Sequence, residues 1–151
     1  MREIKFRAWD KKSKKMRQVA WISFQDYPLR KGLPVVVQVW GWSIIEDKDI
    51  LLRREINEVE LLEFTGLKDK NGKEIFEGDI IKFLGRWDDN GRVLPPDYKP
   101  YIVEFLRGAF TAVPTKYERG HAANFFKEHM AVGHTDNEII GNIYSNPELL
   151  K

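Results

Sequence analysis

The sequence predicts a mainly β protein with minor α content, built from antiparallel sheets or a small barrel and one or two short helices. Short apolar runs, several of which alternate with polar residues, recur along the 151 residues. Clusters of turn-forming residues separate these runs at close spacing, which is typical of antiparallel sheets. Strands do not alternate with long helical segments, so a doubly wound parallel sheet is not expected.

The first strands are predicted to form a hairpin. Apolar and polar residues alternate over residues 4–9, as in a half-buried strand. The polar, lysine-rich segment Asp10–Lys15 is the expected loop, and Met16–Phe24 is the expected second strand. Val35–Trp40 is dense in β-branched residues and predicts another strand. The pattern over Ile50–Ile56 fits a helix or a strand, and the choice stays open.

The middle of the chain combines predicted strands with strong turn signals. Strands are expected at Val59–Phe64 and Ile80–Leu84. Between them, Asn71-Gly72 favours a type I′ turn because both residue types accept a positive φ. A second turn is expected at Glu77–Asp79, and it is a more ordinary interpretation of these acidic residues than a catalytic role. Arg86–Pro100 contains further turn residues and prolines and is expected to be a loop.

The last third of the chain predicts one more hairpin, a helix and a final strand. The hairpin strands are Tyr101–Phe105 and Ala109–Val113. Gly120–Met130 is the best helix candidate, because its apolar residues gather near one helical face. Glu138–Tyr144 predicts the final strand. Ser145–Pro147 then resembles a cap with a first-turn proline, which indicates a short C-terminal helical turn.

The composition is that of a globular protein and excludes several chemistries. Hydrophobic residues make up 42% of the chain and aromatic residues 13%, which is too many for a disordered tail. The absence of cysteine excludes disulfide frameworks, thiolate zinc sites and cysteine nucleophiles. No apolar run is long enough for a signal peptide or a membrane span. We therefore expect a soluble, cytoplasmic protein with no membrane partner.

The net charge of +2 conceals an uneven distribution. Residues 1–20 carry eight basic and two acidic side chains, so the basic excess lies in the predicted hairpin. Trp9 and Trp21 lie near these basic residues. Lysines that neutralise phosphates and exposed aromatic rings that stack on unpaired bases are the elements of a nucleic-acid contact. The candidate residues for contact with nucleic acid or another partner are Arg7, Trp9, Lys11, Lys12, Lys14, Lys15 and Arg17. The alternative is a hairpin that only protects a sheet edge, with its aromatic residues in the core.

Signals for catalysis or metal binding are weak. His121, His129 and His134 lack the tight spacing of zinc ligands. The chain has neither a Gly-x-Ser-x-Gly elbow nor a glycine-rich phosphate loop. The acidic runs Glu46–Asp49 and Asp88–Gly91 could hold a hard cation, although such residues are first of all turn formers. We therefore assign no catalytic, cofactor-binding or metal-binding residues and expect no cofactor.

Three sequence blocks carry a family resemblance. They are Met1–Asp10 with the following Lys15-Met16, then Phe64–Ile81, and finally Ile139–Leu150. In this order they resemble the YopX family of phage and prophage proteins. The resemblance implies a phage-derived cytoplasmic protein with a β-rich, SH3-like barrel portion. It brings no known activity, so no catalytic residues are transferred.

The leading functional expectation is a non-catalytic phage accessory module. We expect one YopX-like domain over residues 1–151, with an N-terminal β subregion at 1–58 and a barrel-like subregion at 59–151. Its expected partner is a host or phage protein, or a second copy that joins as a homo-oligomer through an exposed sheet edge. The first alternative is a nucleic-acid-binding protein that uses the basic hairpin. The second is a metal-dependent enzyme that uses the acidic Asp88-Asp89 loop.

Overall fold

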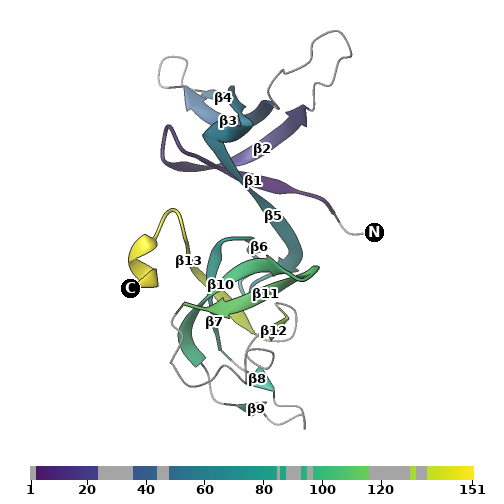
Figure 1. The fold of residues 1–151 in the computed structure, drawn as a ribbon, viewed down its shortest axis with the longest axis vertical. Helices are drawn as coiled ribbons and strands as arrows, with labels where there is room; N and C mark the ends of the chain where they lie inside the picture. Colours follow the sequence, from purple (N-terminus) through teal and green to yellow (C-terminus); the bar gives the residue numbers. More distant parts are fainter. Residues whose placement is uncertain are drawn as a thin grey trace. The chain divides into compact units, whose positions relative to one another are not determined.

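The chain is mainly β, as the sequence predicts (Figure 1). The computed structural model describes residues 3–23, 36–43, 48–84, 86–87, 93–94, 97–115, 130–131 and 136–151. The chain divides into two compact units, here called the N-terminal unit (Lys5–Glu63) and the C-terminal unit, whose main part is Phe64–Lys151. No helix among the described residues is long and apolar enough to cross a membrane.

The N-terminal unit is an antiparallel sheet with the strand order β4-β3-β2-β1-β5. The predicted hairpin is confirmed, and residues 50–55, for which the sequence left helix or strand open, lie in a strand. A short 3-10 helix, η1, follows at Ile56–Glu58 and leads into the next strand. The strands are β1 (Phe6–Asp10), β2 (Lys15–Ser23), β3 (Val36–Ser43), β4 (Lys48–Glu55) and β5 (Val59–Lys68).

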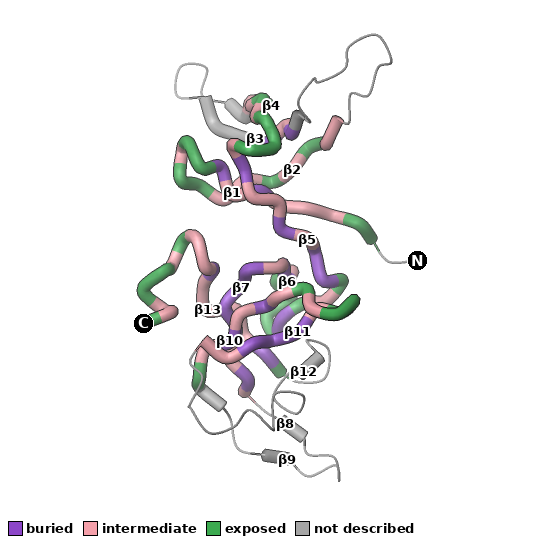
Figure 2. Tube along the Cα trace, in the orientation of Figure 1, coloured by how far each residue is buried: buried purple, intermediate pink, exposed green. Residues whose placement is uncertain are grey.

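The core of the N-terminal unit lies on one face of this sheet, as the strand register shows. Figure 2 marks the buried residues along β1 and β5. Because side chains alternate along a strand, Val37 and Val39 of β3 are fully buried beside Ala8 and Val59. The register places Arg54 opposite Val37, so the two residues share one face of the sheet. An arginine thus lies on the core face, and it needs a carboxylate partner there.

The C-terminal unit has a five-stranded antiparallel sheet with the order β12-β11-β10-β7-β13. Its aromatic core includes Phe83 and Tyr101, whose ring centroids lie 4.9 Å apart at 72°. The short strands β8 (Arg86–Trp87) and β9 (Val93–Leu94) pair separately, and β6 (Glu74–Phe76) pairs with β5. The sheet strands are β7 (Asp79–Phe83), β10 (Asp97–Leu106), β11 (Ala109–Pro114), β12 (Met130–Ala131) and β13 (Asn137–Asn142), followed by the 3-10 helix η3 (Pro147–Leu150).

The type I′ turn lies at a different hairpin from the predicted one. Arg107 and Gly108 both have positive φ, 52° and 86°, and they join β10 to β11. At Asn71-Gly72 only the glycine has a positive φ, at 79°, so the type I′ prediction is wrong there. The Asp69 side chain instead accepts hydrogen bonds from the N–H groups of this loop and closes a longer turn.

Three other expectations need correction or lie beyond the described residues. Arg86–Pro100 is not all loop, because it includes β8, β9 and the start of β10, where an irregular register accommodates Pro100. Of the predicted helix Gly120–Met130, only Met130 is described, and it lies in β12. No closed barrel is found among the described strands, since both sheet orders run from one edge to another. The SH3-like character therefore stays a prediction.

Candidate nucleic-acid interface

The tip of the β1–β2 hairpin is shaped by Asp10. Its carboxylate oxygen Oδ1 accepts hydrogen bonds from the backbone N–H of Lys12 at 3.0 Å and of Ser13 at 3.2 Å. Lys14 then adopts a left-handed φ of 52°, which completes the turn. Lys12, Lys14 and Lys15 therefore lie at the end of the hairpin, and all three are exposed.

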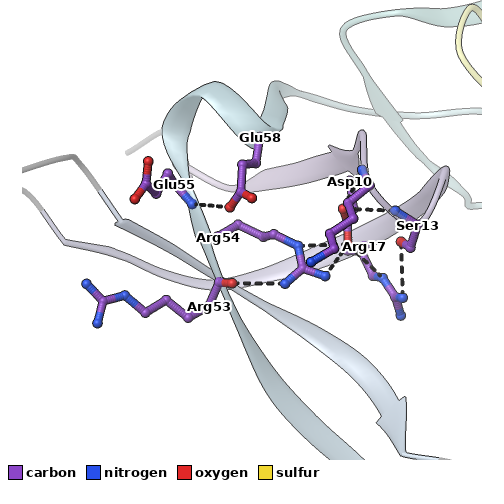
Figure 3. A network of polar contacts seen from close by, with 8 residues as sticks. Asp10, Ser13, Arg17, Arg53, Arg54, Glu55 and Glu58 are labelled. Carbon is purple, nitrogen blue, oxygen red and sulfur yellow. Dashed lines mark hydrogen bonds and ion pairs between the residues drawn. The ribbon is translucent and has the colours of Figure 1, made fainter.

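The other oxygen of Asp10 belongs to a buried ion network (Figure 3). Arg54 donates to Oδ2 from Nη2 at 2.9 Å and from Nε at 3.1 Å. Arg17 places its Nε 4.0 Å from the same oxygen and donates from Nη2 to Ser13 Oγ at 3.3 Å. The Asp10 side chain is fully buried, and the two arginines are about 15% exposed. Arg17 is therefore engaged by the hairpin's own carboxylate.

The network keeps the Asp10 carboxylate ionised in the folded protein. Burial raises the pKa of this group, because a charged form is disfavoured away from water. The hydrogen bonds from Arg54 and Ser13 and the positive charge of Arg54 more than offset burial and lower the pKa to about 2. At neutral pH, Asp10 thus supplies a full negative charge to the buried network.

Lys11 is also engaged within the N-terminal unit. Its Nζ lies 2.6 Å from Glu60 Oε1 and donates to the carbonyl oxygen of Asn57 at 3.0 Å. The backbone N–H of Lys11 donates to the carbonyl of Glu58 at 3.0 Å. These contacts fasten the hairpin to η1 and β5, and they offset the positive charge of Lys11.

The predicted contact residues therefore have different environments. Arg7 and Trp9 are half-buried in β1 and take part in interactions of their own. By contrast, no described carboxylate pairs with the ammonium groups of Lys12, Lys14 or Lys15, here called the tip lysines. The tip lysines are thus the part of the predicted interface that remains available to a ligand.

One exposed aromatic residue of this hairpin lies near the basic segment in the sequence but was not among the candidate contact residues. Trp21 of β2 is 61% exposed, although the alternation from Val19 would turn it toward the core. An extra residue in β2 between the pairs Val19–Val39 and Trp21–Gln38 forms a β-bulge. This bulge shifts the alternation by one position, so Ile22 faces the core and Trp21 faces outward.

The central sequence block is organised around a buried carboxylate, Asp69. Its Oδ1 accepts from the N–H groups of Asn71 at 2.8 Å and Lys73 at 2.9 Å, and its Oδ2 accepts from Ile139 at 3.2 Å. Burial raises the pKa of Asp69, but the hydrogen bonds from these N–H groups have the larger combined effect and hold the pKa below its usual value. Asp69 thereby connects the central block to the terminal block through β13.

A second connection joins the same two blocks. Asp79 accepts from the N–H of Phe76 at 2.8 Å, and Asn142 Nδ2 donates to the carbonyl of Gly78 at 2.8 Å. The oxygen of the Asn142 side chain accepts from Tyr144 N–H at 3.0 Å. The acidic and amide residues of the two blocks therefore serve as hydrogen-bonding partners for the backbone.

The remaining sequence candidates lie outside the described residues. These are the three histidines, the Asp88-Asp89 loop and the acidic pair Glu46-Asp47. Within the described part of the chain, no group of three or more histidine, aspartate or glutamate side chains could hold a metal ion.

The fold and the hairpin define an antiparallel β protein of two units with an exposed basic hairpin tip. The model of the YopX protein family matches residues 5–151, so the chain belongs to the YopX family. The crystal structure of protein EF1440 from Enterococcus faecalis is similar over 100% of both chains, with 24% sequence identity and a TM-score of 0.57. That likeness concerns the fold alone. No curated protein matches the chain.

Proposed function

We propose that this chain is a non-catalytic binding module that contacts the phosphate backbone of nucleic acid through the tip lysines. The observation that carries the proposal is the contrast within the hairpin. Arg17 and Lys11 are engaged by Asp10 and Glu60, whereas the tip lysines are exposed and no described acid neutralises them. Lysines in this state attract phosphates and release counterions when they bind.

The buried carboxylates support a binding role over a catalytic one. A general acid or base must reach a substrate with its own oxygen atoms. The carboxylates of Asp10, Asp69 and Asp79 are buried and accept hydrogen bonds from turns and neighbouring strands. These three carboxylates thus serve to hold the fold.

The proposal places nucleic-acid contact ahead of self-assembly. β4 is an edge strand of its described sheet, where a second copy could add a strand. Charged residues occupy both ends of β4, and such charges protect an edge from strand-to-strand pairing. Membership in the YopX family supports a phage or prophage origin and a cytoplasmic location as further parts of the proposal.

Removal of the tip charges tests the proposal. The variant Lys12→Gln/Lys14→Gln/Lys15→Gln should bind nucleic acid roughly tenfold or more weakly at about 50 mM salt, because three phosphate contacts are lost. Fluorescence anisotropy of a labelled mixed-sequence oligonucleotide, both single-stranded and duplex, measures the dissociation constants.

A matched control separates the tip from general charge. Lys68, Lys73 and Lys151 are exposed lysines of the C-terminal unit. Their combined substitution by Gln lowers the net charge by the same amount and should leave the dissociation constant nearly unchanged. Equal losses in the two triple variants, or wild-type protein that binds neither oligonucleotide, would refute the proposal.

A further inference from the structure

The outward face of β2, β3 and β4 carries an unusual row of side chains. Trp21 lies directly opposite Gln38, and Gln38 lies directly opposite Arg53. Residues opposite one another share a face of the sheet, with Cβ atoms about 5 Å apart. The row therefore presents an indole ring, an amide and a guanidinium group side by side.

Three described side chains of this face are exposed to solvent. Trp21 of β2 is 61% exposed and Leu51 of β4 is 49% exposed. Arg53, two residues after Leu51 on β4, is exposed as well. Arg54, the next residue, lies on the opposite face and is engaged by Asp10. The strand alternation thus divides two neighbouring arginines: one completes the buried network, and the other is available to a ligand.

We infer that single-stranded nucleic acid lies along β2, with phosphates at the tip lysines and an unpaired base stacked on Trp21. This inference rests on the proposed function and specifies its ligand. Lys15 begins β2 six residues before Trp21, and the separation of about 20 Å along the strand is one that a few nucleotides can cover. Lys15 lies opposite Asp10 and the bulge turns Trp21 to the other face, so the nucleic acid meets the tip lysines at the end of the hairpin. Arg53 and Gln38 add hydrogen-bond donors beside the ring, at positions where a base edge or a phosphate would lie.

The chemistry of the row favours a single strand over a duplex. In a duplex the bases are already stacked on one another, so an aromatic side chain on a sheet cannot reach a base face without unstacking it. A single strand offers unpaired base faces to exposed aromatic residues, whatever its sequence. The positive charge of Arg53 and the tip lysines complements the phosphates that lie between the bases.

A substitution at Trp21 tests the inference. Trp21→Ala should weaken binding of an oligothymidine single strand roughly tenfold, because stacking of one base is lost. The same change should leave binding to the oligothymidine–oligoadenine duplex within about twofold, since the duplex has no free base face. Trp21→Phe should recover most of the single-strand affinity.

The control is Phe105→Ala, which removes an exposed aromatic residue of the C-terminal unit (46% exposed) and should change neither affinity. The inference is overturned if Trp21→Ala leaves the single-strand affinity unchanged, or if it weakens single strand and duplex equally. Failure of this inference is distinguishable from failure of the proposed function. If only the inference is wrong, the triple Lys→Gln variant still loses affinity while Trp21→Ala does not.

Discussion

The variant Asp10→Asn is expected to lower the free energy of unfolding by about 3 kcal/mol. Asparagine keeps the size of the side chain and can still accept hydrogen bonds in the turn, but it removes the negative charge. Arg54 and Arg17, each about 15% exposed, would then lose their shared carboxylate. Removal of one partner from a buried ion pair typically costs about 3–5 kcal/mol, because the remaining charge is uncompensated. Denaturant unfolding followed by circular dichroism measures the change.

The matched control for Asp10 is Glu60→Gln. This change breaks the Lys11–Glu60 pair, whose side chains are 44% and 46% exposed, and exposed pairs contribute only about 0.2–1 kcal/mol. The account of the network is contradicted if Asp10→Asn destabilises the protein no more than Glu60→Gln does.

The same network predicts a direction for the pH dependence. The folded pKa of Asp10 is about 2, below its ordinary 3.8. The stabilisation is therefore complete above pH 3.8 and is lost as the pH falls from there toward 2. The stability difference between wild type and Asp10→Asn should shrink accordingly when the pH is lowered from about 6 to about 2. A difference that stays constant over this range would show that the charge of Asp10 is not its source.

The second large effect is expected for Asp69→Ala, at about 3 kcal/mol of unfolding free energy. The substitution leaves the N–H groups of Asn71, Lys73 and Ile139 without their carboxylate acceptor. Each unsatisfied buried donor costs about 1–3 kcal/mol. Water can replace the carboxylate at the exposed residues Asn71 and Lys73 more easily than at Ile139, so the total stays near the cost of one or two donors. Thermal and denaturant unfolding of the purified variant measure the loss.

Lys73→Ala is the control for this turn. The exposed Lys73 side chain is removed while its backbone N–H still donates to Asp69, so stability should change by no more than about 0.5 kcal/mol. If Asp69→Ala is as stable as Lys73→Ala, then Asp69 is not the residue that joins the central block to β13.

Much of the fold could be predicted from the sequence, because strand alternation and turn chemistry are local signals. The β1–β2 and β10–β11 hairpins and the strand at residues 137–142 lie where they were expected. The turn types were harder to predict from the sequence. Asn71-Gly72 has the composition of a type I′ turn, but the side chain of Asp69 organises a different turn. At Arg107-Gly108 the short two-residue connection imposes positive φ on an arginine.

The candidate site was predictable as a region but not in its individual residues. The sequence locates the basic hairpin. However, Lys11 pairs with Glu60 and Asp10 pairs with Arg54, and both partners are distant along the chain. Likewise, the outward direction of Trp21 depends on a bulge that no local pattern indicates. Long-range pairing therefore selects which cations and which aromatic residue are available to a ligand.

The salt dependence of single-strand binding tests the proposed function most directly. The logarithm of the affinity should fall linearly with the logarithm of salt concentration, by about 0.7 for each neutralised phosphate on a single strand. If the tip lysines make three such contacts, the slope for the triple Lys→Gln variant at residues 12, 14 and 15 should be shallower than the wild-type slope by about 2. The variant at residues 68, 73 and 151 should keep the wild-type slope. Identical slopes for wild type and the tip variant would contradict the proposal that this hairpin binds the phosphate backbone.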